Sequence, residues 1–442
     1  MTARAGDRVM ARLARLLSRV FFRRVDVEGV ERMPAGPVVL VANHVNGLVD
    51  GLVLMAMLPR YPRFLGKTTL YRILPLAPFL HLAGVVPVHR TKDTGDAAGR
   101  AIERNDAAFR TCRALLASGG VVAVFPEGIS HDEARVQPLR TGAARIALGA
   151  AFDDGVPGVV TVAVGLVYDD KARFRSRALV RIGEPTGIGS RRGEYERDPV
   201  GAVRSLTDDL GRQLAQVAPM YESRQQELAF RRVACVVADS AAGQDDVSRA
   251  LGAACANGPA AAARVSALTD AAEAYEADLA LVGLSNDDVA AGLTAGRYRR
   301  HLGRAVVAAA ATAPLAAFGA VVHAVPYGIM KQLGRRPANE GMRATVKLLG
   351  CTVLFTALYT AAGIVVGRRR GFSAGVAAFV LGPVSGYVTV RWAERVHRLG
   401  GVARARAVMA ERRDLVADLQ QQRADLIEAA TALMSAPAPT VR

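Results

Sequence analysis

Cysteine is scarce in this chain of 442 residues, and the four that occur are scattered. Cys112, Cys235, Cys255 and Cys351 form no C-x-x-C pair, so the sequence predicts neither a disulfide framework nor a cysteine metal cluster. This usage is typical of a reducing compartment. Arginines interrupt every apolar run before residue 25, and we therefore expect no secretory signal peptide.

Acidic residues and lysine are also few. Forty Asp and Glu stand against 57 Lys and Arg, a formal net charge of +17, and only five of these cations are lysines. The excess of arginine predicts an anionic partner, either nucleic acid, an anionic membrane surface or a phosphorylated substrate. Nucleic acid is disfavoured because the chain lacks a helix-turn-helix pattern, zinc-finger spacing and an aromatic–basic motif. No histidine–cysteine–acid cluster has ligand spacing, so we predict no metal or redox cofactor.

The first 24 residues have the pattern of a basic amphipathic helix. Arginines recur every three or four positions and apolar residues fill the face between them: Arg4, Arg8, Arg12, Arg15, Arg19 and Arg23, with Val9, Met10, Leu13, Leu16, Leu17, Val20 and Phe21. Such a helix can lie in the headgroup layer of an anionic membrane. The alternative is an ordinary helix that docks on the following domain.

Residues 25–195 alternate short apolar runs with segments of helical period such as Ala101–Leu116. The runs predicted as strands are Val38–Ala42, Gly84–Val88, Val121–Phe125, Val159–Val167 and Ala178–Ile182. Buried strands with helices between them predict an α/β domain, in which helices cover a largely parallel or mixed sheet.

The remainder of the chain is predicted to be helical. Residues 196–303 are rich in alanine and contain no predicted strand, and residues 393–442 form a charged helical tail. Between them, residues 304–392 hold three stretches without Lys, Arg, Asp or Glu: Ala305–Met330, Leu348–Gly367 and Gly371–Val390. Each is near the ~20 residues that cross a bilayer core, so we predict membrane-embedded segments. A buried helical hairpin in a soluble domain is the alternative.

The topology of these stretches stays open at this point. Pro314 and Pro326 interrupt the first stretch and Pro383 the third, so kinks or re-entrant turns are open to them. Basic connectors, Lys331–Lys347 and Arg368–Arg370, flank the second stretch. Both cannot be cytoplasmic if every stretch crosses simply, so either one stretch is re-entrant or one basic loop is exported.

The sharpest motif runs from Asn43 to Asp50. A predicted strand ends in Asn43 and His44, and Asp50 follows six positions after the histidine, where a helical segment begins. A neutral imidazole can accept a hydroxyl proton, while a carboxylate on its other nitrogen fixes the tautomer and stabilises the imidazolium. We therefore predict that His44 is a general base and that Asp50 orients it. An acceptor hydroxyl can then attack a thioester directly.

Three cations stand where a phosphate-bearing acceptor can bind. Lys67 precedes the predicted strand that leads to Arg90, and Arg140 stands where a helix rich in small residues begins. Lysine and arginine at strand ends and helix starts suit an anion. Ordinary surface cations are the alternative.

A further motif, FPEG at residues 125–128, turns sharply at Gly128 and leaves Glu127 at the edge of the sheet. An acid there can hydrogen-bond an acceptor hydroxyl or hold a cationic neighbour. The SHD sequence at 130–132 cannot be a serine triad, because three consecutive side chains cannot converge as that geometry requires. A nucleophile elbow is excluded as well, since Asp132 occupies the position of its last glycine.

Together and in this order, these blocks resemble the glycerolipid acyltransferase family, which includes glycerol-3-phosphate and lysophosphatidate acyltransferases, over about residues 25–190. The resemblance implies the helix-covered mixed sheet of that family. It also implies roles by motif: His44 as general base and Asp50 as its orienting acid; Lys67, Gly84 and the phosphate-binding Arg90 in the second motif; Glu127 and Gly128 in the acceptor-binding third; Pro157 in the fourth.

Two features depart from the common pattern. Five residues separate His44 from Asp50 where the family usually has four, and Ser130 stands where many members carry a phosphate-binding arginine. The longer spacer and the EGxSHD form of the third motif are similar to a subgroup resembling fungal glycerol-3-phosphate and dihydroxyacetone-phosphate acyltransferases. We therefore expect Arg90, Lys67 or Arg140 to bind the phosphate of the acceptor.

The resemblance implies acyl transfer from acyl-CoA or acyl carrier protein to a hydroxyl of glycerol-3-phosphate or its 1-acyl form. From the apolar stretches we expect the enzyme to lie in a membrane, with the acyltransferase domain facing the cytoplasm. Remodelling of another phospholipid or glycolipid, or an inactive membrane scaffold, are the alternatives. Besides the catalytic pair, the residues predicted to bind substrate are Asn43, Lys67, Arg90, Glu127, Gly128, Ser130 and Arg140.

Overall fold

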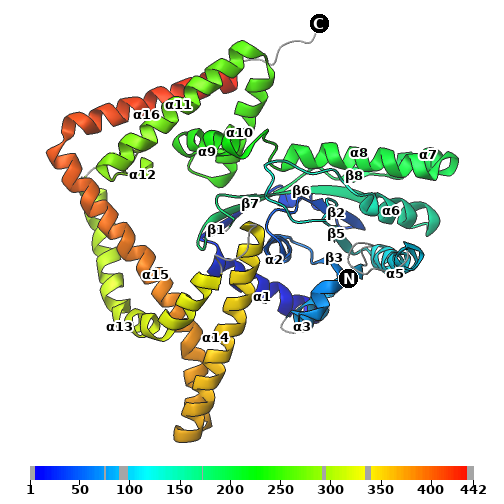
Figure 1. Ribbon diagram of the computed structural model, residues 1–442, viewed down its shortest axis with the longest axis horizontal. Helices are drawn as coiled ribbons and strands as arrows, with labels where there is room; N and C mark the ends of the chain where they lie inside the picture. Colours follow the sequence, from blue (N-terminus) through cyan, green and yellow to red (C-terminus); the bar gives the residue numbers. More distant parts are fainter. Residues whose placement is uncertain are drawn as a thin grey trace. The chain divides into compact units, whose positions relative to one another are not determined.

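A computed structural model of the chain describes residues 5–73, 76–88, 98–171, 173–290, 295–333 and 340–435. The chain forms two compact units, which Figure 1 draws with their helices and strands. The first unit comprises residues 1–222 and 334–349, and the second comprises residues 223–333 and 350–442. The first unit is therefore discontinuous in sequence.

An eight-stranded mixed sheet forms the centre of the first unit. Its spatial order is β1-β7-β6-β2-β5-β3-β4, with β8 paired to β6. β6 runs antiparallel to β7 and β8, and the other pairs are parallel. The strands are β1 Arg24–Glu28, β2 Val38–Ala42, β3 Pro62–Lys67, β4 Val86–Val88, β5 Val121–Val124, β6 Val160–Tyr168, β7 Arg177–Ile182 and β8 Thr186–Gly187. The predicted mixed α/β sheet is confirmed.

Helices cover both faces of this sheet. They are α1 Ala5–Phe21, α2 Leu48–Met57, α3 Ala77–Ala83, α5 Ala98–Ala117, α6 Gly142–Leu148, α7 Arg192–Arg197 and α8 Pro199–Val217. β2 shows how the two faces divide its side chains. Val38, Leu40 and Ala42 join the core cluster that includes α1 and α2, whereas Val39 and Val41 join the cluster that includes α5, α6 and α8. A strand buried on both faces is apolar throughout, and this is why the sequence predicted it.

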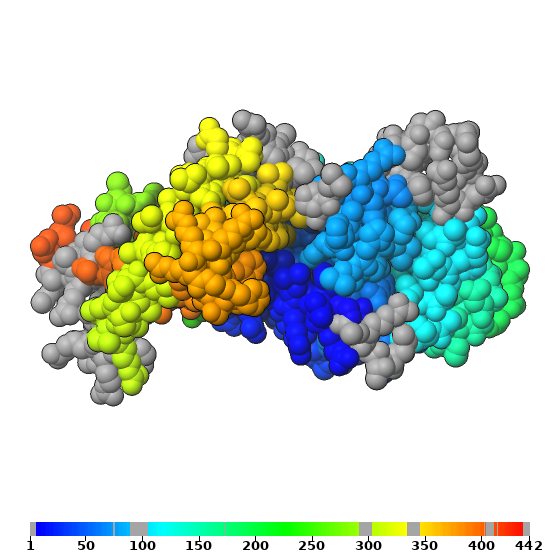
Figure 2. Space-filling model, turned by 90° about the horizontal axis from the view of Figure 1, so that it is seen from below, coloured from blue at the N-terminus to red at the C-terminus, as the bar shows by residue number. Residues whose placement is uncertain are grey.

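The amphipathic helix α1 docks on the first unit through one face. Met10 and Ala14 are fully buried in the core, and α1 packs against α2 and α3. Figure 2 shows α1, in dark blue, at the surface beside α3. Its other face exposes arginines and two apolar side chains: Arg8, Arg12, Arg15, Arg19, Val9 and Leu16. Docking on the domain therefore leaves a basic face open.

Parallel strands bring the predicted motifs to one edge of the sheet. His44 follows the end of β2, Glu127 follows the end of β5, and Lys67 is the last residue of β3. These three strands are neighbours in the order β2-β5-β3, so their carboxyl ends meet. In open α/β sheets this edge is where ligands bind.

Helices alone make up the described part of the second unit. They are α9 Arg224–Val237, α10 Ala241–Ala256, α11 Pro259–Val282, α12 Asn286–Ala290, α13 Ala295–Leu333, most of α14 Glu340–Arg370, α15 Phe372–Glu411 and α16 Arg413–Ser435. Phe230, Leu251, Tyr275 and Leu419 are buried where α9, α10, α11 and α16 pack together. Figure 1 shows α16 running beside α11.

Within the described residues, three helices are long and apolar enough to cross a membrane: Gly303–Leu333, Thr345–Arg370 and Phe372–Gly401. Side-chain hydrogen bonds link them within the second unit. Nε2 of His323 lies 2.8 Å from the Tyr359 hydroxyl, and Nε1 of Trp392 donates to the carbonyl of Ala309 at 2.9 Å. α13 continues through Pro314 and Pro326, and Figure 1 shows it strongly curved.

Candidate active site

His44 and Asp50 form a hydrogen-bonded pair at the carboxyl end of β2. Nδ1 of His44 lies 2.9 Å from Oδ2 of Asp50. The Asp50 side chain is fully buried in the first turn of α2, whereas 20% of the His44 side chain is exposed. Because a carboxylate only accepts hydrogen bonds, Nδ1 carries the proton and Nε2 keeps a lone pair. The pair that the sequence singled out is assembled.

Aromatic rings close one face of the imidazole. Phe125, the first residue after β5, stacks on His44 with ring centroids 4.2 Å apart and an angle of 15° between the planes. Phe64 of β3 continues the stack, 5.8 Å from Phe125. Close packing on this face holds the ring toward Asp50.

The loop between the two residues is fastened at three points. The N–H of Asn46 donates to Oδ2 of Asp50 at 2.7 Å, and the buried Asn46 side chain donates to the carbonyl of Lys171 at 3.2 Å. Gly47 has a φ of 57°, a left-handed conformation that favours glycine, and its N–H donates to Oγ of Ser130 at 3.0 Å. The longer spacer therefore still brings the carboxylate onto Nδ1.

Tyr168, the last residue of β6, is a partner of Asp50 that the sequence did not reveal. Its hydroxyl donates to Oδ1 of Asp50 at 2.7 Å. Burial, together with the adjacent carboxylate, raises the pKa of Tyr168 well above its ordinary value. The alternation of side chains along the predicted strand could have indicated that Tyr168 faces the same side of the sheet as α2. Tyr168 alternates in phase with Leu166 and Val164, which pack in the core cluster that contains α2.

Glu127 is buried, and protein groups occupy its carboxylate. Oε2 accepts the N–H of His44 at 2.9 Å and lies 2.8 Å from Nε2 of His131. Oε1 accepts the N–H of Gln137 at 3.3 Å. These contacts brace the backbone of the base. The prediction that Glu127 hydrogen-bonds an acceptor hydroxyl stays a prediction beside them.

The residues of the SHD sequence face three different partners. Ser130 accepts the N–H of Gly47, His131 pairs with Glu127, and Oδ1 of Asp132 lies 3.3 Å from Nζ of Lys171. The N–H of His131 also donates to the carbonyl of His44 at 3.2 Å. No triad forms among the three side chains, as predicted, and they tie the loop after β5 to the loop after β2.

The beginning of α14 also reaches this site. The N–H of Leu48, at the start of α2, donates to Oγ1 of Thr345 at 3.3 Å. Leu348 packs against the core cluster of the same unit. A segment nearly 300 residues further along the chain thus supports the turn that carries Asp50.

Two of the three predicted phosphate-binding cations lie in the described part of the chain. Lys67 ends β3 and is partly exposed. Arg140 is exposed and lies close to Gly128. A Cβ added at Gly128, whose φ of 74° is left-handed, would lie only 2.6 Å from Nε of Arg140. Arg90 lies outside the described residues. Phosphate binding by these cations stays a prediction.

Asn43 is 2% exposed and links two strands. Its side chain donates to the carbonyl of Leu166 at 3.0 Å and accepts the N–H of the same residue at 2.7 Å. β2 and β6 are thereby joined immediately before the base. Pro157, assigned to the fourth motif by resemblance, is exposed before β6.

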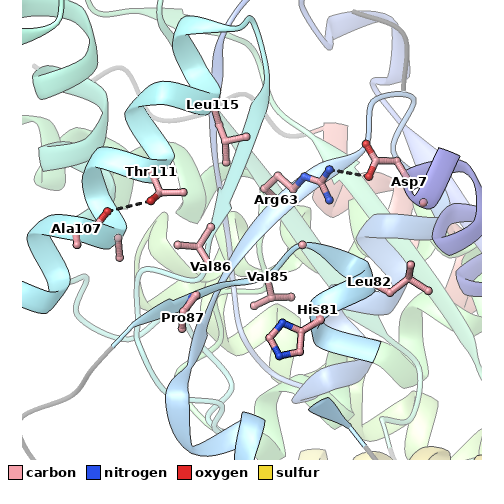
Figure 3. A pocket seen from close by; sticks show the side chains of 13 residues that line it. Asp7, Arg63, His81, Leu82, Val85, Val86, Pro87, Ala107, Thr111 and Leu115 are labelled. Atoms are coloured by element: carbon pink, nitrogen blue, oxygen red, sulfur yellow. Dashed lines mark hydrogen bonds and ion pairs between the residues drawn. The ribbon is translucent and has the colours of Figure 1, made fainter. Parts of the chain in front are cut away.

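A cavity of about 690 Å³ opens beside the edge strand β4 (Figure 3). Its wall is mostly apolar, with Val85 and Val86 from the edge of the sheet. NH2 of Arg63 pairs with Oδ1 of Asp7 at 2.6 Å on one side of it. Gly84 of the second motif lines this cavity. None of the described residues that were predicted to act in catalysis or to bind substrate lines it. The cavity is therefore distinct from the catalytic pair.

Within the described ranges, no three His, Cys, Asp or Glu side chains lie close enough to hold a metal ion. The expectation that the protein needs no cofactor stays a prediction. The described groups instead offer a base: a ring with a free lone pair on Nε2, held by a buried carboxylate on Nδ1. Such a pair can take a proton from a hydroxyl and return it to a leaving group.

Comparison with known proteins connects this geometry to a family. Residues 24–166 match the family described as Acyltransferase. Glycerol-3-phosphate O-acyltransferase 2 of Saccharomyces cerevisiae is 35% identical over 133 residues, which are 29% of this chain and 18% of that protein. A chloroplastic 1-acyl-sn-glycerol-3-phosphate acyltransferase of Brassica napus is 28% identical over 158 residues, 35% of this chain and 42% of the relative. This chain thus spans less than half the length of either relative.

Among solved structures, the 1-acyl-sn-glycerophosphate acyltransferase of Thermotoga maritima is 18% identical, with a TM-score of 0.33. The match covers 48% of this chain and 78% of that one. The segment matched by the family contains His44, Asp50 and Glu127. Over residues 24–166 this chain is similar to the acyltransferase family.

Proposed function

We propose that this protein is a membrane-associated O-acyltransferase of phospholipid biosynthesis. It transfers a fatty acyl group from acyl-CoA or acyl carrier protein to a hydroxyl of glycerol-3-phosphate or its 1-acyl form. The observation that carries the proposal is the 2.9 Å contact between His44 and the buried Asp50, inside the segment that matches the acyltransferase family. The acceptor class is supported by the relatives, whose names specify glycerol-3-phosphate and 1-acyl-sn-glycerol-3-phosphate.

The reaction uses the lone pair on Nε2 of His44. Nε2 takes the proton of the acceptor hydroxyl as its oxygen bonds to the thioester carbonyl carbon. The buried Asp50 stabilises the imidazolium so formed. The carbon–sulfur bond then breaks, and the thiolate leaves with the proton from His44. An ester and a thiol result, and the base is regenerated.

Two features support work at a membrane. The three apolar helices are long enough to span a bilayer, and α1 keeps a basic face exposed. Each CH₂ that leaves water contributes about 0.8 kcal/mol, so long acyl chains reside in the bilayer. An enzyme held there meets a soluble head and a lipid-dissolved tail together. We place the acyltransferase domain on the cytoplasmic side, in keeping with the four free cysteines of the chain.

Purified full-length protein should be assayed with acyl-CoA and with acyl carrier protein against a panel of acceptors, with products identified by mass. Glycerol-3-phosphate and its 1-acyl form are the expected acceptors. Activity confined to another phospholipid or a glycolipid would establish the remodelling alternative. A folded protein inactive with every pair would point to the scaffold.

His44→Ala should lower the rate by about 10²–10⁴-fold, the usual contribution of a general base, in a protein that stays folded. His397→Ala is the matched control, because His397 is an exposed histidine of α15 in the other unit. It should retain full activity. Normal turnover by a folded His44→Ala protein would refute His44 as the base.

A further inference from the structure

Three donors hold the carboxylate of Asp50, and only one of them belongs to His44. Oδ2 accepts Nδ1–H of His44 and the N–H of Asn46, while Oδ1 accepts the hydroxyl of Tyr168 at 2.7 Å. Asp50 is fully buried, so its oxygens depend on these protein groups in place of water.

We propose that Tyr168 is a positioning residue of the catalytic pair, whose hydroxyl holds the Asp50 carboxylate turned toward Nδ1 of His44. The proposal rests on the proposed function, in which His44 is the base. Tyr168 acts through Asp50 and needs no contact with substrate.

The direction of the hydrogen bond is fixed by chemistry. An ionised carboxylate only accepts, so the phenol donates. Burial and the neighbouring carboxylate raise the pKa of Tyr168 well above its ordinary value, so the phenol keeps its proton wherever an imidazole titrates. The bond therefore spreads the negative charge of Asp50 without neutralising it.

Packing holds the phenol in place. Tyr168 is 5% exposed, and its ring stacks on Phe22 with centroids 5.7 Å apart and 25° between the planes. Phe22 lies just beyond α1, and its carbonyl accepts a hydrogen bond from the guanidinium of Arg175 at 2.6 Å. The same guanidinium donates to the carbonyl of Arg19 at 2.7 Å. The ring is thus fixed from the end of α1.

The other charged groups near the pair have different partners. Glu127 and His131 bind the backbone of His44, and Nζ of Lys171 pairs with Asp132. Among the described residues, none of these side chains contacts the carboxylate of Asp50. Apart from His44, Tyr168 is therefore the side chain on which that carboxylate depends.

Removal of the phenolic hydroxyl should strengthen the attraction between the Asp50 carboxylate and a protonated His44. The carboxylate then concentrates its charge toward the imidazole, and the imidazolium is favoured. The pKa of His44 should therefore rise in Tyr168→Phe, and less of the neutral base is present at a given pH. Only the part of the hydrogen-bond energy that differs between the neutral and the charged imidazole moves the pKa, so the rise is at most about one pH unit.

The test measures the protonation of His44 without any substrate. Diethyl pyrocarbonate acylates neutral imidazole, and peptide mass spectrometry distinguishes His44 from the six other histidines of the full-length protein. The modification rate between about pH 5 and pH 9 gives the midpoint. Tyr168→Phe should move the midpoint up, by at most about one unit. Replacement of Tyr168 by 3,5-difluorotyrosine, a stronger donor, should move it down.

Two controls isolate the path through Asp50. Tyr61→Phe removes a half-buried phenol elsewhere in the same unit, whose hydroxyl donates to the carbonyl of Ala83 at 3.2 Å, and it should leave the midpoint unchanged. In an Asp50→Asn background, Tyr168→Phe should cause no further shift of the midpoint, because the effects of residues that act as a unit are not additive.

An unmoved midpoint in folded Tyr168→Phe, or an equal shift in the Asp50→Asn background, would overturn the proposal. The fluorinated protein keeps the hydroxyl and decides the question if the phenylalanine variant does not fold. Failure to transfer acyl groups would refute the proposed function without affecting these midpoints, so the two outcomes are separable.

Discussion

The carboxylate of Glu127 has two possible roles beside the base, either binding the acceptor or supporting the backbone of His44. From the sequence it is predicted to bind the acceptor, whereas in the structure it accepts the N–H of His44 and contacts His131. Glu127→Gln keeps one acceptor oxygen and loses the other. We expect a loss of about 1–3 kcal/mol in the free energy of unfolding and a lower kcat, because buried donors lose their partner.

Denaturant unfolding and steady-state kinetics on the same protein check this expectation. Glu133→Gln is the matched control, since Glu133 is exposed in the same loop. A Glu127→Gln protein of normal stability and kcat, but with a raised KM for the acceptor, would assign Glu127 to substrate binding.

Burial separates the cysteines by reactivity. Cys112 is fully buried, and desolvation raises the pKa of its thiol to about 12, whereas Cys235 is exposed. A raised pKa lowers the thiolate fraction, to about 10⁻⁴ at about pH 8. Iodoacetamide should therefore label Cys235 and spare Cys112 in the folded protein, as measured by peptide mass. Equal labelling rates would show that the helix α5 opens or that the thiol is ionised.

At the scale of elements, the contact between β6 and α8 depends on a missing side chain. A Cβ at Gly165 would lie 1.9 Å from the carbonyl oxygen of Val217, the last residue of α8. Gly165→Ala must therefore displace the helix end or the strand, at a cost of about 1–3 kcal/mol in the free energy of unfolding.

Gly187→Ala provides the comparison, because Gly187 lies in β8 of the same sheet and an added Cβ meets nothing within 4 Å. Thermal unfolding should separate the two variants clearly. If Gly165→Ala is as stable as Gly187→Ala, then α8 can shift on the sheet without loss.

Four of the five strands predicted from sequence have side chains buried on both faces, and the fifth prediction, Gly84–Val88, contains the edge strand β4. β2, β5, β6 and β7 are apolar runs for this reason, and the structure confirms them. β1 was not predicted because Arg24, Asp26 and Glu28 alternate with valine at the edge of the sheet. β3 was missed as well, since it begins at Pro62 and contains Gly66.

The site was predictable as far as its residues are close in sequence. His44 and Asp50 stand six positions apart, and one motif holds both. Tyr168 meets Asp50 across 118 positions, and this contact follows only from the pairing of β6 with β2. The buried contacts of Glu127 likewise depend on how two loops fold together, which spacing along the chain cannot specify.

At the scale of the whole molecule, the three apolar helices should decide where the protein is found. We expect the full chain to remain in the membrane pellet after washes with high salt and with alkaline carbonate. Salt screens the attraction of the α1 arginines to anionic lipid, whereas a helix that spans the bilayer is released only by detergent. Immunoblots of pellet and supernatant give the measurement. Release by carbonate would indicate that the apolar stretches form a hairpin within a soluble domain.

The contact between Leu48 and Thr345 bears on how the catalytic half of this molecule can be isolated. The first unit contains residues 334–349 as well as residues 1–222. A gene truncated after codon 222 therefore removes Thr345, which accepts a hydrogen bond from the turn that carries Asp50. A soluble fragment for crystallography should instead carry the short peptide 340–349 rejoined through a flexible tether. The matched family segment, residues 24–166, is narrower still, and trimming to that window would strip away both α1 and α8.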